Sequence, residues 1–563
     1  MNFNMKRKPL LPGLLALSMA GLLQAQAQPV NFNWFEYSGQ DAGAPKAGAG
    51  EYHNPILAGF YPDPSICRVG EDYYLINSTF AYFPGIPVFH SRDLVNWQQV
   101  GNVIHRPNQL RYHHLGVSEA IFAPTLRHHN GVFYVICTMV GAEGNFVVTA
   151  TNVAGPWSQP VKLGFEGIDP SLFFGEDGHA WVVNNGPPEG VPRYDGHRAI
   201  WIQEFDAVAS RMVGPRKVLV DGGVDPSKNP IWIEGPHLYQ REGWYYLCCA
   251  EGGTGPQHSQ VIFRSRQVTG PYTPWAQNPM LTQRNLSANE PGAVTCTGHA
   301  DLVIGPDNHW WAVFLGVRPY DGRYSPMGRE TFLLPVKWTE DGWPVILPSG
   351  ERVPLTVKSP GGAAEPAETI PLNGSFTWRD DFKESALSPA WIMLRTPAET
   401  WWKLDPAHGQ LALTPQRDLL SGNGNPSFLA RRVQHARFTA ATSLAVPQPG
   451  VSAGLAVFQN EQHHYFFAVQ ADGSGLTLYL ERAQNGNPER IGAVPVPLVS
   501  TLKLRVTVND AKCAFAYAAG TNDWQTLVAD ADATLLTSEV AGGFVGATVG
   551  LHARVDGQSP PPH

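Results

Sequence analysis

Short apolar runs separated by polar turns fill most of this chain, and between residues 51 and about 350 they recur as a repeat. Five times, a strand-like run is followed eleven or twelve residues later by an aromatic residue on a second apolar run. The aromatic positions lie 47 to 65 residues apart, the size of a four-stranded propeller blade. The pattern predicts an all-β chain whose first domain, residues 51–355, is a five-bladed β-propeller. The motifs begin at Asp63, Ala123, Asp169, Glu234 and His299, and the paired aromatics are Tyr74, Tyr134, Trp181, Tyr246 and Trp311.

A second β-rich region follows a stretch of Gly, Ala and Pro. The stretch from Ser359 to Ala367 has the composition of a linker, which we place at residues 356–370. Beyond it, alternating apolar and polar positions recur in short runs at even spacing, at 454–458, 464–469, 476–480 and 502–508. Such runs predict a β-sandwich over residues 371–556.

Both ends of the chain differ from these two domains. Lys6, Arg7 and Lys8 precede an apolar stretch at 10–23 and a small-residue site at Ala25 to Ala27, so residues 1–27 are expected to be a signal peptide. The apolar stretch is too short to span a bilayer. We therefore expect an exported protein, periplasmic or extracellular. Residues 28–50 are expected to be an extended leader, and residues 557–563 a flexible tail.

Composition narrows the choice of ligand. The chain has 57 Gly and 49 Pro, only 16% charged residues and a net charge of −8, with no long basic run, which argues against nucleic-acid binding and favours a neutral substrate. The six cysteines contain no CxxC pair, so a zinc or redox motif is not predicted. Cys67, Cys137 and Cys248 fall in apolar runs and are expected to be buried thiols.

Three of the five motif starts are carboxylates: Asp63, Asp169 and Glu234. A propeller gathers equivalent strand ends around one axis, so the three side chains are predicted to meet. Hydrolysis of a glycosidic bond needs one protonated carboxyl and one ionised carboxyl. A third acid can keep the proton donor protonated, because two close carboxylates resist joint ionisation.

At these motifs the chain resembles glycoside hydrolase family 43, a family of inverting enzymes with five-bladed propellers. The similarity includes FPGIPVFHSRDLVNW in the first repeat, and the second domain resembles the concanavalin-like (jelly-roll) sandwich of the family's β-xylosidase branches. The matching segments are NPILAGFYPDPSI around Asp63, GIDPSLFF around Asp169, IWIEGPHLY around Glu234, TGHADLV around His299 and MGRETFL around Arg329.

The resemblance assigns roles by position. It implies that Asp63 is the general base, Glu234 the general acid and Asp169 the residue that tunes the pKa of Glu234. It also implies that Arg329 contacts a sugar hydroxyl, and that His299 lies in the central channel, where it is expected to contact the substrate and could neighbour a structural Ca²⁺. No other cofactor is expected.

Aromatic side chains are expected to form the wall against which the sugar stacks, and Tyr82, Phe83 and Phe122 are the candidates. Phe122 stands where the family often has Trp. The main interpretation is an exo-acting enzyme that releases α-L-arabinofuranosyl or β-D-xylosyl units from hemicellulose or its oligosaccharides. The alternatives are an endo-acting arabinanase, a retaining fructosidase-like hydrolase, and a non-catalytic propeller that binds carbohydrate. The sequence does not fix the oligomeric state.

Overall fold

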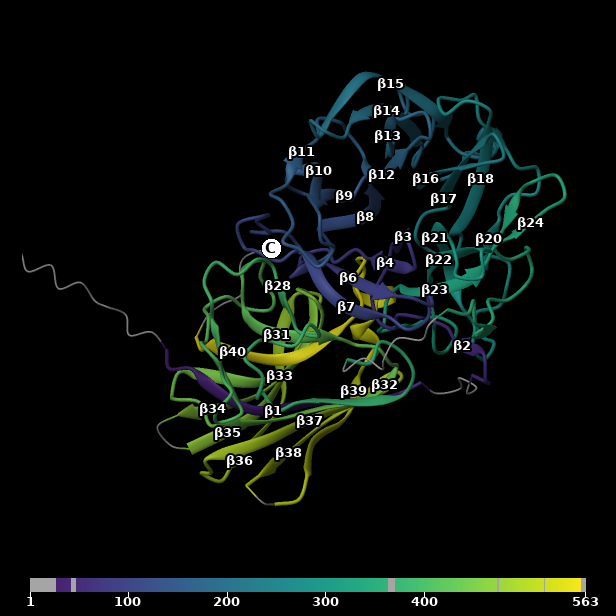
Figure 1. The fold of residues 1–563 in the computed structure, drawn as a ribbon. Coiled ribbons are helices and arrows are strands. Elements are labelled where there is room, and N and C mark those ends of the chain that lie inside the picture. Colours follow the sequence, from purple (N-terminus) through teal and green to yellow (C-terminus); the bar gives the residue numbers. More distant parts are fainter. Residues whose placement is uncertain (1–26, 42–46, 363–369, 473–474, 521, 558–563) are drawn as a thin grey trace, which may run out of the picture.

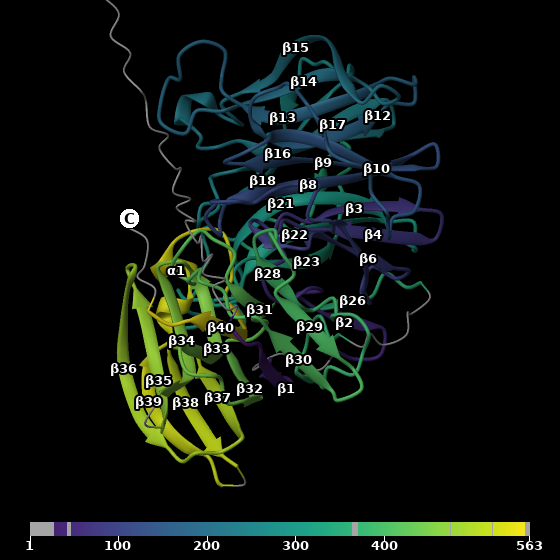
Figure 2. The same cartoon turned by 90° about the vertical axis from the view of Figure 1, so that its left-hand side faces the viewer.

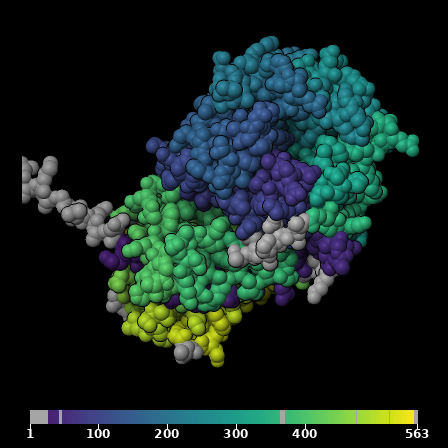
Figure 3. All heavy atoms as spheres, viewed as in Figure 1, coloured from purple at the N-terminus to yellow at the C-terminus, as the bar shows by residue number. Residues whose placement is uncertain are grey.

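The computed structural model describes residues 27–41, 47–362, 370–472, 475–520 and 522–557. The predicted signal peptide, apart from its last residue, and nearly all of the predicted tail lie outside these ranges. Figures 1 and 2 show two β-domains, the propeller in blue and teal and the sandwich in green and yellow. Figure 3 shows them packed against each other as one body. No helix among the described residues is both long and apolar enough to cross a membrane.

The first domain is the five-bladed propeller. Four blades have four-stranded order, β3-β4-β6-β7, β8-β9-β10-β11, β12-β13-β14-β15 and β16-β17-β18-β19, with β20 beside β18, and the fifth is β21-β22-β23. The innermost strands contact one another in a closed ring, β3 to β8, β12, β16, β21 and back to β3. The strands of the first three blades are β3 (Ser65–Val69), β4 (Asp72–Ile76), β6 (Gly85–Ser91), β7 (Gln98–Ile104), β8 (Ala120–His129), β9 (Val132–Val140), β10 (Gly144–Ala150), β11 (Val161–Lys162), β12 (Ile168–Phe174), β13 (Ala180–Gly186), β14 (Ala199–Asp206) and β15 (Arg211–Asp221). Those of the last two are β16 (Glu234–Arg241), β17 (Trp244–Glu251), β18 (Ser259–Ser265), β19 (Thr273–Pro274), β20 (Leu281–Thr282), β21 (Thr295–Ile304), β22 (Trp310–Val317) and β23 (Glu330–Pro335).

At the repeat position of each innermost strand, one residue lies in the left-handed backbone region; Asp63 precedes its strand, and the other four lie within theirs. The φ angles are 52° at Asp63, 37° at Ala123, 53° at Asp169, 54° at Gly235 and 52° at His299. In blades two to five this residue lies at a shift in strand register, as in a β-bulge, which re-aims a side chain at a strand end. The repeat position in the fourth blade is therefore Gly235, and Glu234 precedes it by one residue. The predicted equivalence of Glu234 with Asp63 and Asp169 is wrong by this one position.

The chain entering the propeller also closes it. Leu57 forms a β-bridge with Thr331 of the last blade, and the Asn54 amide donates to the Leu333 carbonyl at 2.9 Å. Strand β2 (Glu51–His53) pairs with β26 (Thr356–Lys358), so the first residues of the predicted linker belong to the propeller. A short hairpin, β24 (Lys337–Trp338) with β25 (Pro344–Val345), and a 3-10 turn at Pro226–Lys228 complete this domain.

The second domain is a sandwich of two eight-stranded antiparallel sheets. One sheet has the order β29-β30-β1-β32-β37-β38-β39 with β27 beside β1, and the other has β36-β35-β34-β33-β40-β31-β28-β5. The strands of the first sheet are β1 (Val30–Gln40), β27 (Phe376–Asp380), β29 (Trp402–Asp405), β30 (Gln410–Leu413), β32 (Arg437–Ala445), β37 (Thr501–Asn509), β38 (Lys512–Ala519) and β39 (Gln525–Asp532). Those of the second are β5 (Tyr82–Phe83), β28 (Ile392–Leu394), β31 (Ser427–Arg432), β33 (Val451–Asn460), β34 (His463–Asp472), β35 (Gly475–Gln484), β36 (Asn487–Val496) and β40 (Thr548–Val555), with short turns Thr534–Leu536 and α1 (Ser538–Ala541) before β40.

Strand β1 corrects the expectation that residues 28–50 form a leader. It lies inside the first sandwich sheet, paired with β32, β30 and β27. Its alternating residues Val30, Phe32, Phe35 and Tyr37 are buried in the sandwich core. Residues 30–40 have the periodicity of a strand, but the Gly, Ala and Pro residues that follow them favoured the prediction of a leader. The strands that pair with β1 lie over 300 residues later in the chain.

Candidate active site

The axis end of the inner strands brings together the charged residues that the sequence singled out. Asp63 precedes β3, Asp169 is the second residue of β12 and Glu234 opens β16. His299 lies in β21, and Arg329 directly precedes β23. All five side chains are less than one-tenth exposed. Carboxylates from three blades therefore share one nearly buried site, where charges interact strongly because little water screens them.

Asp63 is held as an anion. Its Oδ1 accepts a hydrogen bond from Arg329 Nη1 at 3.1 Å, and its Oδ2 accepts one from Ser78 Oγ at 2.6 Å. Burial by itself would raise the pKa of Asp63, but Arg329, His299 and the Ser78 hydroxyl outweigh burial and lower the pKa below its ordinary value. Ser78 is itself fixed, because its Oγ accepts the Ala123 backbone N–H at 2.7 Å.

Glu234 is held in the opposite state. Burial and then the charge of Asp169 raise the pKa of Glu234 to about 8; His299 opposes them, Asp63 adds a smaller increase and Arg329 a smaller decrease. Asp169 Oδ2 accepts the backbone N–H of Gly235 at 3.1 Å, which fixes Asp169 against the residue that follows Glu234. At neutral pH the site therefore pairs a protonated Glu234 with an ionised Asp63.

His299 completes the site as a cation. Its Nε2 lies 3.6 Å from Asp169 Oδ2. Burial would lower the pKa of His299, but Asp169, Asp63 and Glu234 together raise it to about 9. The ring packs directly on Gly235, where a Cβ would come within 2.8 Å of Nε2, so the site requires glycine there. His299 Nδ1 is buried without a hydrogen-bond partner among the described residues.

A second guanidinium borders Glu234, and the sequence analysis did not include it. Arg198 stacks on the ring of Trp232, with 4.9 Å between its guanidinium carbon and the ring centroid. Its Nε and Nη2 donate to Asn185 Oδ1, at 3.1 and 2.8 Å, rather than to a carboxylate. Asn185 in turn donates to the carbonyl of Ile233 at 2.6 Å. Arg198 and Trp232 thus flank the acid, and no repeat of the sequence marks them.

The aromatic wall differs from the predicted one. Phe122 is half-buried at the site and makes an edge contact with Phe80, at 5.2 Å between ring centroids. The prediction for Tyr82 and Phe83 is wrong. Strand β5 pairs with β28 of the sandwich, so both side chains are buried at the domain boundary, where the Tyr82 hydroxyl lies 3.1 Å from Thr548 Oγ1.

The sandwich supplies an aromatic ring of its own. Phe544, in the segment before β40, stacks on Phe80 at 6.2 Å and meets Phe122 edge-on at 5.6 Å. The guanidinium carbon of Arg329 lies 5.7 Å from the Phe544 ring centroid and 5.9 Å from that of Phe80. The Phe544 N–H donates to Ser118 Oγ at 2.9 Å, which anchors the segment to the propeller. The sequence gives no signal for Phe544, because it lies in the other domain.

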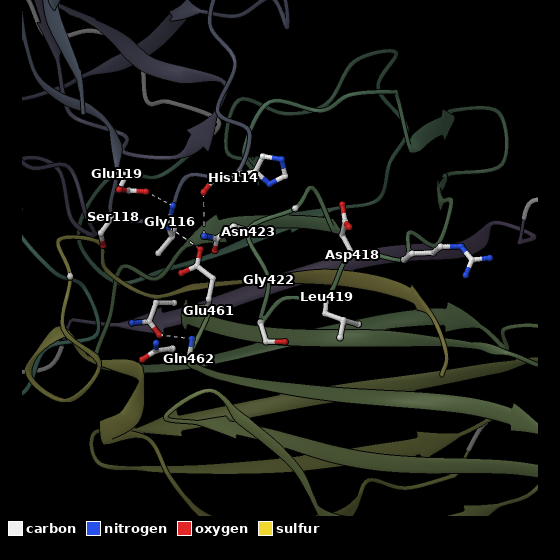
Figure 4. Close-up of a pocket in the computed structure, with 16 residues that line it drawn as sticks. His114, Gly116, Ser118, Glu119, Asp418, Leu419, Gly422, Asn423, Glu461 and Gln462 are labelled. Atoms are coloured by element: carbon white, nitrogen blue, oxygen red, sulfur yellow. Dashed lines mark hydrogen bonds between the residues drawn. The ribbon is translucent and has the colours of Figure 1, made fainter. Parts of the chain in front are cut away.

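Two cavities lie on either side of this segment. One, of about 480 Å³, is lined by Arg329, Phe544, Thr254 and Cys296 among others, and Arg329 links it to the carboxylates. A larger one, of about 890 Å³, lies between propeller residues such as His114 and Glu119 and sandwich residues such as Asp418, Asn423 and Glu461 (Figure 4). Neither cavity is lined by the three predicted catalytic carboxylates. Arg329, which donates a hydrogen bond to Asp63, lines the smaller cavity, so the smaller one is the candidate substrate pocket.

Models of known protein families match both domains of the chain. A family model described as glycosyl hydrolases family 43 matches residues 52–344, and one described as β-xylosidase C-terminal concanavalin A-like domain matches residues 379–560. The chain is 38% identical over 514 residues to a xylosidase/arabinosidase of Butyrivibrio fibrisolvens, covering 90% of this chain and 96% of that protein. It is 35% identical over 524 residues to the non-reducing end α-L-arabinofuranosidase BoGH43B of Bacteroides ovatus, covering 90% and 92%.

A solved structure shows the same arrangement of both domains. A GH43_12 protein from a capybara gut metagenome superposes with a TM-score of 0.88 at 39% identity, covering 94% of this chain and 100% of that one. A xylan β-1,4-xylosidase from Bacillus halodurans superposes with a TM-score of 0.80 at 33% identity, covering 90% and 98%. The chain, with its propeller, its carboxylate triad and its concanavalin-like sandwich, belongs to glycosyl hydrolase family 43.

Proposed function

We propose that this glycoside hydrolase releases single pentosyl units, α-L-arabinofuranosyl or β-D-xylosyl, from the ends of hemicellulose chains or their oligosaccharides with inversion of configuration. The observation that carries the proposal is the pair of opposite protonation states, a protonated Glu234 and an ionised Asp63 in one buried site. Inverting hydrolysis needs one carboxyl in each state. The names of the relatives, which include both xylosidases and arabinosidases, support the choice of pentose substrates.

The chemistry follows from these two states. Glu234 gives its proton to the glycosidic oxygen as the bond to the anomeric carbon breaks. A water oxygen forms the new bond to that carbon from the other face, and Asp63 takes the proton that the water loses. The products are a free sugar of inverted configuration and the shortened chain. Exchange with solvent then returns the proton from Asp63 to the bulk and reprotonates Glu234.

Other residues prepare this step without exchanging protons. Asp169 keeps Glu234 protonated by charge repulsion, and Ser78 with Arg329 fixes the Asp63 carboxylate. Phe544 sits beside Arg329 at the cavity, which supports exo rather than endo action, because a ring from the second domain limits the space for a continuing chain. No step requires a cofactor.

A substrate panel tests the proposal. Purified enzyme is incubated with aryl β-D-xyloside, aryl α-L-arabinofuranoside, xylo-oligosaccharides, arabinoxylan and linear arabinan, and the released sugars are separated. We expect monomeric pentose from at least one of the two aryl pentosides and from the xylo-oligosaccharides or arabinoxylan that carry the same sugar, and ¹H NMR of early products should show the inverted anomer first. Internal cleavage of arabinan, or retention of configuration, would contradict the proposal. Asp63→Asn serves as the inactive control.

We further infer that the protein acts outside the cytoplasm. The support is the basic, apolar and small-residue order of residues 1–27, which is the order of an export signal. All six cysteines are free thiols in the structure, and Cys67, Cys137 and Cys248 are buried as predicted, so the fold does not depend on an oxidising compartment. Fractionation of cells that express the full chain tests the inference. Mature protein that begins after Ala27 is expected outside the cytoplasm, and full-length protein in the cytoplasm would contradict it.

A further inference from the structure

A second ring of polar side chains lies directly beneath the catalytic one. Each inner strand has a polar residue two positions after its left-handed residue, and all five are buried: Ser65, Thr125, Ser171, His237 and Asp301. Two strand residues correspond to about 6–7 Å. This ring therefore forms the floor of the active site on the propeller axis, where the family resemblance suggests a structural Ca²⁺.

One guanidinium occupies the centre of this floor. Arg127 belongs to β8, yet its Nη1 and Nη2 donate to Asp301 of β21 at 2.9 and 3.1 Å. Its Nη2 also donates to His237 Nδ1 of β16 at 3.0 Å. Strands β16 and β21 are not neighbours of β8 in the ring of inner strands. The side chain must therefore reach across the axis to make these contacts.

The partner of Arg127 has its acceptor positions filled. Besides the two-pronged contact with Arg127, Asp301 accepts hydrogen bonds from Ser65 Oγ at 2.8 Å and Tyr239 OH at 2.6 Å. The backbone N–H groups of Ile66 and Leu302 also donate to it, each at 3.0 Å. Such bidentate pairs are the strongest hydrogen-bonded ion pairs of proteins. The single carboxylate of this floor is thus neutralised from within the chain.

A calcium ion would not fit the same place. Ca²⁺ takes about six to eight oxygen ligands, several of them carboxylate oxygens. The floor offers one carboxylate, already paired, and His237 Nδ1 faces the Arg127 guanidinium and Ser171 Oγ. Above it, His299 Nε2 lies 3.6 Å from Asp169 Oδ2. Among the residues that the structure describes, no group of three or more His, Cys, Asp or Glu side chains could hold a metal ion.

We propose that the Arg127 guanidinium is the built-in axial cation of this propeller and takes the place of a structural metal ion, so that the channel binds no divalent metal. The charge that a metal would bring to the floor of the active site is then covalently part of the protein. Chelators and Ca²⁺ should leave both the stability and the activity of the enzyme unchanged.

Metal content and thermal unfolding of the wild-type protein test the proposal first. The protein is dialysed against CaCl₂ and then against metal-free buffer, and its bound metals are measured by mass spectrometry. Unfolding is followed with EDTA, CaCl₂ and MgCl₂. We expect no stoichiometric ion, and the same Tm and the same kcat/KM on an aryl pentoside in all three. A bound ion whose removal lowers Tm would overturn the proposal, since a ligand of the native state stabilises it.

Variants test whether a cation is needed at this position. Arg127→Met keeps most of the side-chain volume but leaves Asp301 unpaired, so its Tm should fall and should now rise when CaCl₂ or MgCl₂ is added. Arg127→Lys, which keeps the charge, should show no response to either ion. Arg127→Met combined with Asp301→Asn should recover stability without any ion.

A control variant separates this effect from the loss of any arginine. Arg68→Met removes a guanidinium of the first blade that, among the described residues, donates to the backbone carbonyls of Gly70, Ile304 and Gly305 and to no carboxylate. It should show no response to divalent ions. An Arg127→Met protein as stable as wild type, and indifferent to ions, would overturn the proposal. If Arg127→Met does not fold, the double variant and the wild-type metal content still decide.

Discussion

The two rings on the propeller axis are built from the same strand ends, yet they treat charge in opposite ways. In the lower ring, one cation faces one carboxylate, and Asp301 accepts hydrogen bonds from every side. In the upper ring, Arg329 and His299 are the cations that contact the carboxylates, and the carboxyls number three. The charges of the lower ring cancel, whereas the upper ring has one carboxyl group more than it has cations to pair with.

This difference explains where the chemistry lies. Both rings are buried, and the lower one more deeply, so burial alone does not make an active site. The excess acid in the upper ring must keep its proton, and Glu234 is the one that does, because Asp63 is paired with Arg329 and Asp169 with the Gly235 N–H and His299. Perturbed ionisation of this kind concentrates at functional sites. Substitutions in the upper ring should therefore change the rate far more than substitutions in the lower ring.

Asp63→Asn is expected to have the largest effect. Removing the base leaves no group to take the proton of the attacking water, so kcat should fall by about 10³- to 10⁴-fold on every substrate. Steady-state kinetics on xylobiose and an aryl pentoside measure it. Asp93→Asn is the matched control, because Asp93 is equally buried in the same blade but lies outside the site. If both variants lose activity equally, Asp63 has no special role.

Glu234→Gln should come second and should depend on the substrate. With an unactivated sugar leaving group, kcat should fall by about 10²- to 10⁴-fold, because the leaving oxygen receives no proton. A good aryl leaving group needs little protonation, so the loss there should be small. The same variant should also be more stable than wild type at high pH. A group whose pKa is raised on folding contributes stability at low pH that is lost as the pH rises, and glutamine does not titrate.

The pH dependence of kcat/KM should be set by Asp63 on the acid side and first by Glu234 on the alkaline side, since His299, with a pKa of about 9, loses its charge only at higher pH. The protonated fraction of Glu234 decreases above its pKa of about 8, so activity on oligosaccharides should fall as the pH rises through this value. Asp63 has a lowered pKa, so the acid limb should lie below the range of an ordinary aspartate. His258, near the site, has its pKa lowered to about 4 by burial and should add no alkaline limb. An alkaline limb that persists in Glu234→Gln but disappears in Glu251→Gln would contradict the assignment.

Phe544→Ala should lower kcat/KM moderately, and this loss would show that the sandwich contributes a residue to the active site. The variant removes the ring beside Arg329, and a cation–π contact contributes about 0.5–2 kcal/mol. Since about 1.4 kcal/mol is a factor of ten, kcat/KM should fall by roughly tenfold. Val540→Ala, an equally exposed change in the preceding helix, should leave kcat/KM unchanged. Equal effects of the two changes would remove Phe544 from the site.

Asp301→Asn should have the smallest effect on rate and a large one on stability. Breaking a buried ion pair costs about 3–5 kcal/mol of unfolding free energy, since Arg127 is left as an unpaired buried charge. The activity of each folded molecule should change only a few-fold. Chemical denaturation and active-site normalised kinetics measure the two effects. A loss of kcat as great as that of Asp63→Asn would mean that the lower ring takes part in the chemistry.

The repeat predicted the propeller and the three carboxylates because both are encoded locally. A strand end, a proline and an apolar triplet recur with their aromatic partner, and Asp63, Asp169 and Glu234 belong to that unit. The one-residue displacement of Glu234 escaped, although the proline follows Asp63 and Asp169 by one residue and Glu234 by two; the left-handed φ of Gly235 makes the displacement clear. Strand β1, Phe544 and the burial of Tyr82 escaped for another reason. Each depends on contacts between segments hundreds of residues apart, which no local pattern records.

The most direct test of the account is the dependence of kcat/KM on leaving-group acidity, measured for wild type and Glu234→Gln with a series of aryl pentosides. If Glu234 protonates the leaving oxygen, wild type should respond weakly to the pKa of the leaving phenol. The variant should lose rate steeply as that pKa rises, and the two lines should approach each other at the most acidic phenol. Parallel lines would show that the proton comes from another group and would contradict the central claim.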